Sequence, residues 1–170
     1  MTSISRSIVA LAGFSVALAG WPASAAHAAG ASGRSEAVVV RRLSLVKTED
    51  LDWGTLVTSP LAGTATIDSV SGARTTTSGV VAAGGTPRRA EFVGAGQIGL
   101  LTVVTLGASP VLDNGSGGTM ATLLLLDGPG ARLFPGTGIQ TIGVGGILAV
   151  GASQAAGNYT GSFNLTVTYF

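Results

Sequence analysis

The chain closes on the stretch Gly157-Asn158-Tyr159-Thr160-Gly161-Ser162-Phe163-Asn164-Leu165-Thr166-Val167-Thr168-Tyr169-Phe170. Its apolar residues fall on one parity, and small polar residues occupy most of the other. Side chains of a β-strand alternate between two faces, so this pattern predicts a half-buried strand that runs to the last residue. The residues expected to pair this strand with a neighbour during assembly are Tyr159, Phe163, Leu165, Val167 and Tyr169.

Composition extends the strand prediction along the chain. The sequence contains 27 Gly and only 10% charged residues, and turn signals such as Ser71-Gly72 recur throughout. The segments between these turns predict strands at Ala37–Val46, Thr64–Val70, Arg89–Val93, Leu100–Leu106, Thr119–Leu126, Ile139–Val150 and Tyr159–Tyr169. This spacing predicts an all-β, immunoglobulin-like antiparallel β-sandwich of about seven or more short strands. We expect it to form a single domain over residues 37–170.

The first 28 residues have the pattern of a signal peptide, because Arg6 precedes an apolar run and a small-residue region. Two A-x-A sites compete, at residues 23–25 and 26–28, and we favour cleavage after Ala28. The apolar run is too short for a permanent membrane span, so no transmembrane segment is expected in the mature chain. Residues 29–36 predict a flexible mature N-terminus. The protein is therefore expected to be exported to the periplasm, the cell surface or the medium.

Cleavage after Ala28 would remove His27, the one histidine, from a chain that has no cysteine. The mature chain then lacks the common zinc, copper and iron ligands and the bases of Ser-His and Cys-His nucleophile pairs. We expect no cofactor, no metal and no enzymatic activity. The full chain has nine Lys and Arg and eight Asp and Glu. Loss of Arg6 with the signal peptide leaves eight of each, so the formal net charge of the mature chain is zero. This balance gives no basic surface for nucleic acid, so no nucleic-acid partner is expected.

A dinucleotide-like motif, G-x-G-x-x-G, occurs at residues 94–99. The fingerprint requires a helix after its last glycine, whereas residues 100–106 are apolar and β-branched. The interpretation that we favour is a hairpin loop.

Acidic residues occur in two places where a site is conceivable. Residues 113–118, Asp-Asn-Gly-Ser-Gly-Gly, suggest a tight turn, with a calcium loop as the alternative. Glu49, Asp50 and Asp52 precede Trp53, which we expect to anchor the core. The alternative for this cluster is a pair of carboxylates that hydrolyse a glycosidic bond. Such carboxylates normally lie in a cleft rich in aromatic side chains, and this chain is only 5% aromatic. We therefore favour a solvated loop.

Several motifs together resemble a bacterial family, DUF4402, from about Val38 to Phe170. They are Leu51-Asp52-Trp53-Gly54, Ser71-Gly72-Ala73-Arg74, residues 87–93, Gly117-Gly118-Thr119-Met120, residues 144–152 and Gln154-Ala155-Ala156-Gly157-Asn158-Tyr159-Thr160-Gly161. The last motif is the most specific of them, and Trp53 stands where Phe is more usual. The resemblance implies an exported immunoglobulin-like domain and no established activity.

The closing strand is also similar to the ends of chaperone–usher pilus subunits and of the spore coat protein U group. That resemblance implies an incomplete sandwich finished by a strand from another molecule, either a chaperone or a second subunit. Ala37, Val39, Leu43 and Leu45 share one parity and suit such a donor strand, although Arg41 interrupts them. The interpretation that we favour is that this segment is the domain's own first strand.

The expected function is therefore that of a structural or adhesive component of the bacterial envelope, pilus-like in its assembly. The alternative is a periplasmic or secreted module that binds carbohydrate or calcium. The loop from Glu49 to Trp53 is the best candidate for such a binding site.

Overall fold

The computed structural model describes residues 34, 36, 37, 39 and 41–170. Residues 38–170 form one compact unit. The expected signal peptide lies outside the described residues, as does the expected flexible terminus apart from Arg34 and Glu36. The strands are β1 (Ser44–Glu49), β2 (Thr55–Ile67), β3 (Arg74–Gly84), β4 (Ala90–Ala95), β5 (Leu101–Leu106), β6 (Val111–Asp113), β7 (Thr119–Leu126), β8 (Ala131–Leu133), β9 (Ile139–Val150) and β10 (Leu165–Tyr169).

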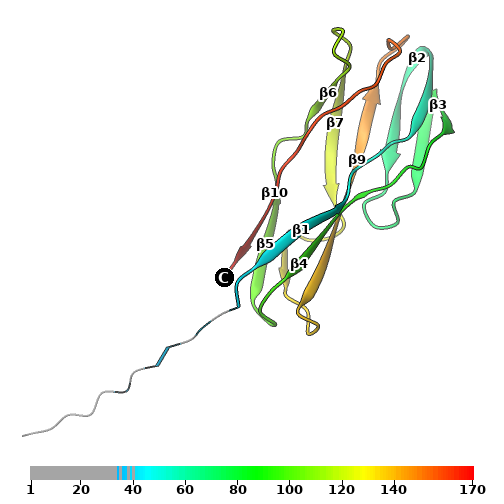
Figure 1. Cartoon of the computed structure of the whole chain (residues 1–170). Helices are drawn as coiled ribbons and strands as arrows, with labels where there is room; N and C mark the ends of the chain where they lie inside the picture. Colours follow the sequence, from blue (N-terminus) through cyan, green and yellow to red (C-terminus); the bar gives the residue numbers. More distant parts are fainter. Residues whose placement is uncertain (1–33, 35, 38, 40) are drawn as a thin grey trace, which may run out of the picture. The chain divides into compact units, whose positions relative to one another are not determined.

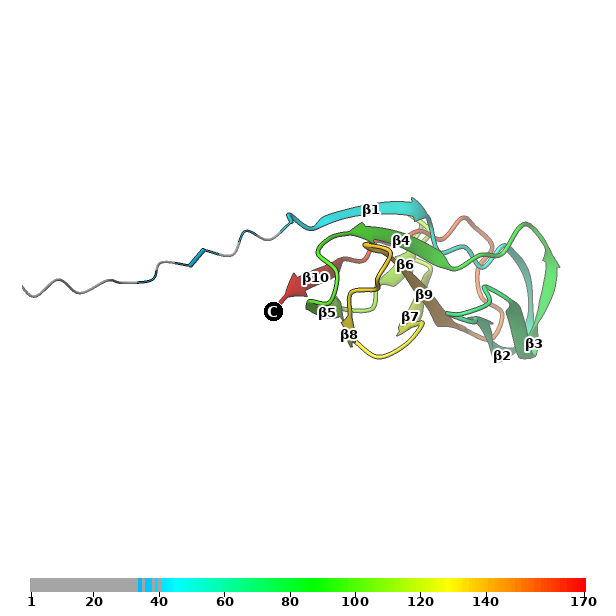
Figure 2. The ribbon, with the colours of Figure 1, turned by 90° about the horizontal axis from the view of Figure 1, so that it is seen from below.

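The strands form two antiparallel sheets (Figure 1). The larger sheet has the order β1-β4-β9-β2-β3, with β7 paired to β9 and β6 paired to β7. The smaller sheet has the order β10-β5-β8 and lies against the half of the larger sheet that contains β1 and β4 (Figure 2). The predicted all-β sandwich is confirmed. The described part of the chain contains no helix long and apolar enough to cross a membrane.

The long strand β9 organises the larger sheet. β4 pairs with residues 139–144 of β9 and β2 pairs with residues 146–150, while β7 pairs with residues 144–148. Val144 therefore pairs with both β4 and β7, and residues 146–148 pair with both β2 and β7. Because a strand has only two edges, β2 and β4 occupy the same edge of β9, one after the other. Glycine is required at this junction, because a Cβ on Gly145 would lie 2.3 Å from the Ile67 carbonyl oxygen.

Two clusters of buried side chains form the core. The first cluster lies between β2, β9 and the β6–β7 hairpin, and its largest members include Trp53, Ile67, Met120 and Leu148. The second lies between the two sheets and includes Phe92, Val104, Leu124 and Ile142. Inward-facing residues alternate with exposed residues along β7 and β10, as expected for strands with one buried face.

Two predicted strands coincide with the observed ones and two are displaced. β7 and β9 have the predicted bounds. The first strand is β1, Ser44–Glu49, whereas the sequence predicted Ala37–Val46; its pairing with β4 begins at Ser44 and Ala95. The predicted strand Thr64–Val70 overlaps only the last four residues of β2, which begins at Thr55 and ends at Ile67, before Asp68 starts a turn.

The edge strand β3, Arg74–Gly84, was not predicted. Its sequence is mainly threonine, glycine and alanine, which resembles a loop in composition. Pairing with β2 from Ile67 and Arg74 onward makes it a strand, so tertiary pairing overrides its weak local signal. The short strands β6 and β8 were missed for the same reason.

The predicted terminal strand Tyr159–Tyr169 is shorter in the structure, where β10 covers Leu165–Tyr169. The residues before it run alongside β6, because Thr160 and Asp113 exchange backbone hydrogen bonds of 3.0 and 2.9 Å. The predicted alternation nevertheless holds along the whole stretch.

Candidate functional site

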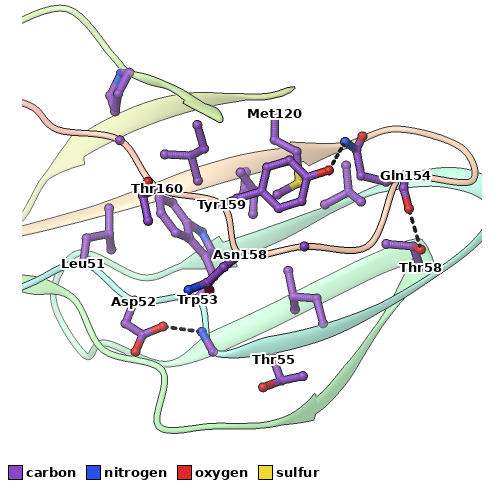
Figure 3. Close-up of a pocket in the computed structure, with 18 of the residues that line it drawn as sticks. Leu51, Asp52, Trp53, Thr55, Thr58, Met120, Gln154, Asn158, Tyr159 and Thr160 are labelled. Atoms are coloured by element: carbon purple, nitrogen blue, oxygen red, sulfur yellow. Dashed lines mark hydrogen bonds between the residues drawn. The ribbon is translucent and has the colours of Figure 1, made fainter. Parts of the chain in front are cut away.

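A cavity of about 760 Å³ lies between the start of β2 and the segment that leads from β9 to β10 (Figure 3). Its floor belongs to the first core cluster, so it opens directly onto the hydrophobic interior. The larger apolar side chains that line it are Leu51, Trp53, Leu56, Val57, Pro110, Leu112, Met120, Leu124, Leu148, Val150, Tyr159 and Phe163. A well-packed sandwich leaves few voids larger than a water molecule, so this opening marks a place where the core is not covered.

A second cavity, of about 300 Å³, continues from the first toward the start of the domain. It is bounded by Lys47 and Asp50 on one side and by residues 161–163 on the other, and its floor is Ala90 and Phe92. Asp50, Gly161 and Phe163 line both cavities. The two cavities are therefore halves of one opening, which we call the groove, with a wide half over Trp53 and a narrow half over Phe92.

An edge strand adjoins each wall of the groove. One wall is Lys47 of β1 with residues 50–58, and the other is the segment 154–163, beyond which β10 continues outside the two cavities. Among the described residues, β1 pairs only with β4, and β10 pairs only with β5. β1 and β10 lie side by side in both views of the fold (Figures 1 and 2). Each wall therefore presents unpaired backbone N–H and C=O groups.

The five C-terminal residues predicted to mediate assembly share one face of the second wall. Each of them is half-buried, whereas Thr160, Ser162, Asn164, Thr166 and Thr168 between them are exposed. Phe163, Leu165 and Val167 pack against the second core cluster, and Leu45 of β1 packs against it from the opposite wall. These apolar side chains sit at the rim of the core with part of their surface uncovered.

Tyr169 differs from the other four because its partners lie at the far end of the sandwich. Its ring packs edge-on against Phe134, with centroids 5.9 Å apart. Its hydroxyl accepts a 2.9 Å hydrogen bond from the backbone N–H of Gln97. Tyr169 therefore fixes the end of β10 to the connection between β4 and β5.

A polar cluster closes the wide end of the groove (Figure 3). The Tyr159 hydroxyl donates to the Ala155 carbonyl at 2.7 Å and accepts from Gln154 Nε2 at 2.8 Å. The Ser153 N–H donates to the Ser59 carbonyl at 2.9 Å, which joins the segment to β2. A tyrosine whose hydroxyl returns to a backbone carbonyl a few residues upstream is a feature of immunoglobulin-like sandwiches.

Trp53 lies in the first core cluster with 8% of its surface exposed, and it lines the wide half of the groove. Gly54 follows it with φ of 68°, a conformation that favours glycine. Arg74 Nη1 donates to the Trp53 carbonyl and to the Gly84 carbonyl, which holds the start of β2 against β3. The buried indole Nε1 has no hydrogen-bond partner within the structure.

The acidic cluster before Trp53 is divided among separate partners. Glu49 accepts a hydrogen bond from Arg88 at 2.7 Å, Asp50 pairs with Lys47, and Asp52 Oδ1 accepts from the Gly54 N–H at 2.7 Å. Of the three carboxylates, Asp50 and Asp52 line the groove. Within the part of the chain that the structure describes, no group of three His, Cys, Asp or Glu side chains is placed to hold a metal ion.

The two other motifs lie outside the groove walls or at their margin. Residues 113–118 form the tight turn of the β6–β7 hairpin, where Asn114 Oδ1 accepts from the N–H groups of Ser116 and Gly118. Residues 94–99 begin with the last two residues of β4 and lead to β5 in the other sheet, so the expected hairpin loop is wrong. β4 pairs with β1 and β9 instead, and no helix follows the motif.

The sequence predicted residues on both sides of the groove. Asp50, Leu51, Asp52 and Trp53 of the expected binding loop line the wide half, and Tyr159 and Phe163 of the closing stretch line it from the other side. The alternation in the closing stretch indicates that one face is apolar but not that the face lies at an open rim. The unpaired edges depend on which strands the fold places beside one another.

A family model, Domain of unknown function (DUF4402), matches residues 43–169. This match spans β1 to β10 and includes both walls of the groove. The chain is therefore a member of the DUF4402 family. No curated protein and no solved structure matches the chain.

Proposed function

We propose that this protein is an exported structural subunit of the bacterial cell envelope, and that it assembles by accepting an additional β-strand into the groove. The observation that carries the proposal is the arrangement of β1 and β10. Each is an edge strand with one unpaired side, and both adjoin an opening onto the hydrophobic core that is lined by Lys47 of β1 and by Phe163, two residues before β10.

An added strand between β1 and β10 would stabilise the sandwich in two ways. Its backbone would supply hydrogen-bond partners to one or both edges, which is the general mode of β-strand addition. Its side chains would cover Leu45, Leu165 and Val167, which are half-buried in the structure. Completing the burial of such side chains contributes about 1 kcal/mol each, because full burial of Leu or Val is worth about 1.5–3 kcal/mol.

Export is part of the proposal and is supported by the sequence pattern of residues 1–28. The carboxylates along the first wall support a structural role. Each of them hydrogen-bonds or pairs with a different group, so they do not converge on one point as catalytic carboxylates would. A chain that lacks cysteine also has to gain its stability from packing and from backbone pairing.

The test is a shear experiment on intact producing cells, followed by a denaturing gel with and without boiling and a blot for this chain. Strand-exchanged assemblies predict a ladder that collapses to one band on boiling. A single band in both lanes would contradict assembly. Ser162→Trp fills the narrow half and should abolish the ladder. Thr168→Trp is the matched control and should preserve it, because Thr168 is also exposed but lines neither half of the groove.

A binding module for a small ligand is the second candidate, favoured by the volume of the wide half and by Trp53 in its lining. In a chain that begins at Ala29, Trp53 is the one tryptophan. A saturable shift of its fluorescence on titration with a soluble polysaccharide or with calcium would support this function. An unchanged spectrum across the series would argue against it.

A further inference from the structure

We propose that one end of the sandwich docks on the surface of an anionic phospholipid bilayer. This end consists of the loops 96–100 and 134–138 with the strand ends that meet them, and we call it the tip. The inference goes beyond the proposed function, because no residue of the tip lines either half of the groove.

Five strand ends meet at the tip. β4 ends at Ala95 and β9 begins at Ile139, and these two residues are paired. β5 begins at Leu101, which pairs with Leu133 at the end of β8. The N–H of Phe170, which follows β10, donates to the Leu101 carbonyl at 2.9 Å. Figure 1 shows these ends, together with the start of β1, at the lower end of the sandwich.

Large apolar side chains surround the tip. Between 42% and 71% of the surface of each is exposed, and they are Ile98, Leu101, Leu133, Ile139 and Phe170. Leu101, Leu133 and Phe170 form a row across the outer face of the smaller sheet, because they are neighbours in the strand register. Ile139 faces outward from the larger sheet, since residues 140 and 142 on the other parity are buried. Exposed apolar patches on such domains mark protein or membrane interaction sites.

The two loops at the tip are held together by backbone hydrogen bonds. The Gly96 N–H donates to the Gly138 carbonyl at 3.1 Å, and the Gly99 N–H donates to the Phe134 carbonyl at 3.0 Å. Neither loop contains a charged residue. The tip therefore presents its apolar side chains without a charged loop residue whose desolvation would oppose contact with lipid.

The charged side chains beside the tip are basic. Arg41 and Arg42 shortly precede Ser44, whose pairing with Ala95 places the start of β1 at this end. Both arginines are exposed, and neither pairs with an acidic side chain in the described part of the chain. They are therefore available to the headgroups of an anionic surface.

No acidic side chain belongs to the tip. Glu91 pairs with Gly143 across β4 and β9, and the Asp127 N–H donates to the Gly143 carbonyl. Both acidic residues therefore join β9 four residues from Ile139, which is about 13 Å along the strand. Each of them also forms a salt bridge with an arginine. An anionic surface would meet two arginines at this end and no side-chain carboxylate.

A bilayer surface fits this geometry better than a second protein does. The exposed apolar side chains belong to the outer faces of both sheets, so they point in different directions around the tip. A rigid partner would cover one of these faces, whereas the headgroup region surrounds an inserted tip on all sides. Interfacial binding combines buried apolar area with attraction of basic residues to anionic lipid.

The first experiment is vesicle flotation of the chain that begins at Ala29, because flotation separates vesicle-bound protein from assemblies that sediment. Vesicles of phosphatidylglycerol and phosphatidylethanolamine should bind the chain at least about tenfold more tightly than phosphatidylcholine vesicles, since each arginine near an anionic surface contributes about fivefold. High salt should remove most of this difference. No flotation with either vesicle, or equal flotation with both, would overturn the inference.

The second experiment tests the apolar part of the tip. Leu133→Ser should weaken binding to the anionic vesicles about tenfold, because less apolar surface is buried. Leu123→Ser is the matched control and should change binding less than about twofold. Leu123 is also an exposed leucine, but it pairs with Ile147, eight residues from Ile139 along β9. Both variants should keep the thermal midpoint of the parent, and equal losses of binding would overturn the inference.

The third experiment tests the basic part of the tip. Arg41→Ser and Arg42→Ser should each weaken binding to the anionic vesicles about fivefold and leave binding to phosphatidylcholine unchanged. Arg88→Ser changes the net charge by the same amount, but Arg88 pairs with Glu49 at the far end of β1. It should therefore have little effect. Equal effects of all three variants would assign the attraction to net charge and overturn the role of the tip.

A site-specific reporter shows which end enters the lipid. The chain contains no cysteine, so one introduced thiol can carry an environment-sensitive dye. On the anionic vesicles, the emission of a dye on Ile98→Cys should shift to shorter wavelength, and that of a dye on Leu123→Cys should not. A shift at Leu123→Cys alone would place the contact elsewhere and overturn the inference.

A second copy of the chain is the competing occupant. In that case sedimentation velocity would show a dimer that Leu133→Ser dissociates, without any vesicle binding, and the lipid inference would be overturned. The outcome is separate from that of the proposed function. Leu133→Ser should leave the ladder of sheared assemblies intact, and Ser162→Trp should leave vesicle binding unchanged, because Leu133 lines neither half of the groove and Ser162 lies outside the tip.

Discussion

Phe163, two residues before β10, packs edge-on against Phe92 of β4, with ring centroids 6.2 Å apart and an interplanar angle of 72°. This contact joins the second wall of the groove to the larger sheet. Both rings also line the narrow half of the groove. The pair therefore holds the two sheets together at the place where the core is least covered.

Replacing Phe163 with alanine should destabilise the protein by about 2–3 kcal/mol. Fully buried Phe→Ala changes cost about 3–5 kcal/mol, and Phe163 is half-buried. Urea denaturation measures the loss. Phe170→Ala is the control, because 71% of the surface of Phe170 is exposed, and its stability should stay within about 0.5 kcal/mol of the parent.

Tyr159→Phe removes the hydroxyl that links Ala155 and Gln154. We expect a loss of about 1–2 kcal/mol, since each net hydrogen bond is worth about 0.5–1.5 kcal/mol and Gln154 loses a partner. The loss should be local. Amide hydrogen exchange should accelerate in residues 151–160 and stay unchanged in β4. Uniform acceleration in both regions would contradict a local role.

Gly145→Ala should destabilise the fold strongly, because its Cβ would lie 2.3 Å from the Ile67 carbonyl oxygen and 2.6 Å from the Ser69 nitrogen. Backbone atoms cannot move aside as a flexible side chain can, so we expect a cost of about 3 kcal/mol. Gly136→Ala is the matched control, with nothing within 4 Å of the new Cβ. Similar thermal midpoints for the two variants would refute the shared-edge arrangement of β2 and β4.

The pKa of Asp68 is lowered, chiefly because its carboxylate accepts a hydrogen bond from the Ser71 N–H and a second one from the Ser71 hydroxyl. A lowered folded-state pKa stabilises the protein above the unfolded value of about 3.9, and this contribution is lost as the pH falls through the folded pKa. A carboxyl-carbon NMR titration should give an Asp68 midpoint below that value. Ser71→Ala should raise it, and an unmoved midpoint would contradict the assigned cause.

Much of the fold could be predicted because the deciding signals are local. The alternation in the closing stretch identified the buried face of β10, and turn residues set the ends of β7 and β9. Trp53, expected from the sequence to anchor the core, lies in the first core cluster. These features depend on the periodicity of apolar side chains and on the positions of turn-forming glycines, both of which can be read directly from the sequence.

The remaining features depend on tertiary neighbours. β3 has weak strand propensity and becomes a strand through β2, so composition alone indicated a loop. The start of the first strand was misplaced because the apolar residues before Ser44 resemble a strand in sequence, whereas the pairing with β4 begins at Ser44. The loop from Glu49 to Trp53 was expected as a binding site and four of its residues line the groove, but the extent of the opening could not be predicted, because it depends on which strand edges the fold places near one another.

The central claim is that an added strand occupies the groove beside β1 and β10, and amide hydrogen exchange of the sheared assembly, compared with the monomeric Ser162→Trp chain, tests it most directly. Assembly should protect amides in residues 44–49 and 165–169 and leave residues 131–133 of β8 unchanged. Protection that is absent from both groove walls, or equal in β8, would contradict the account.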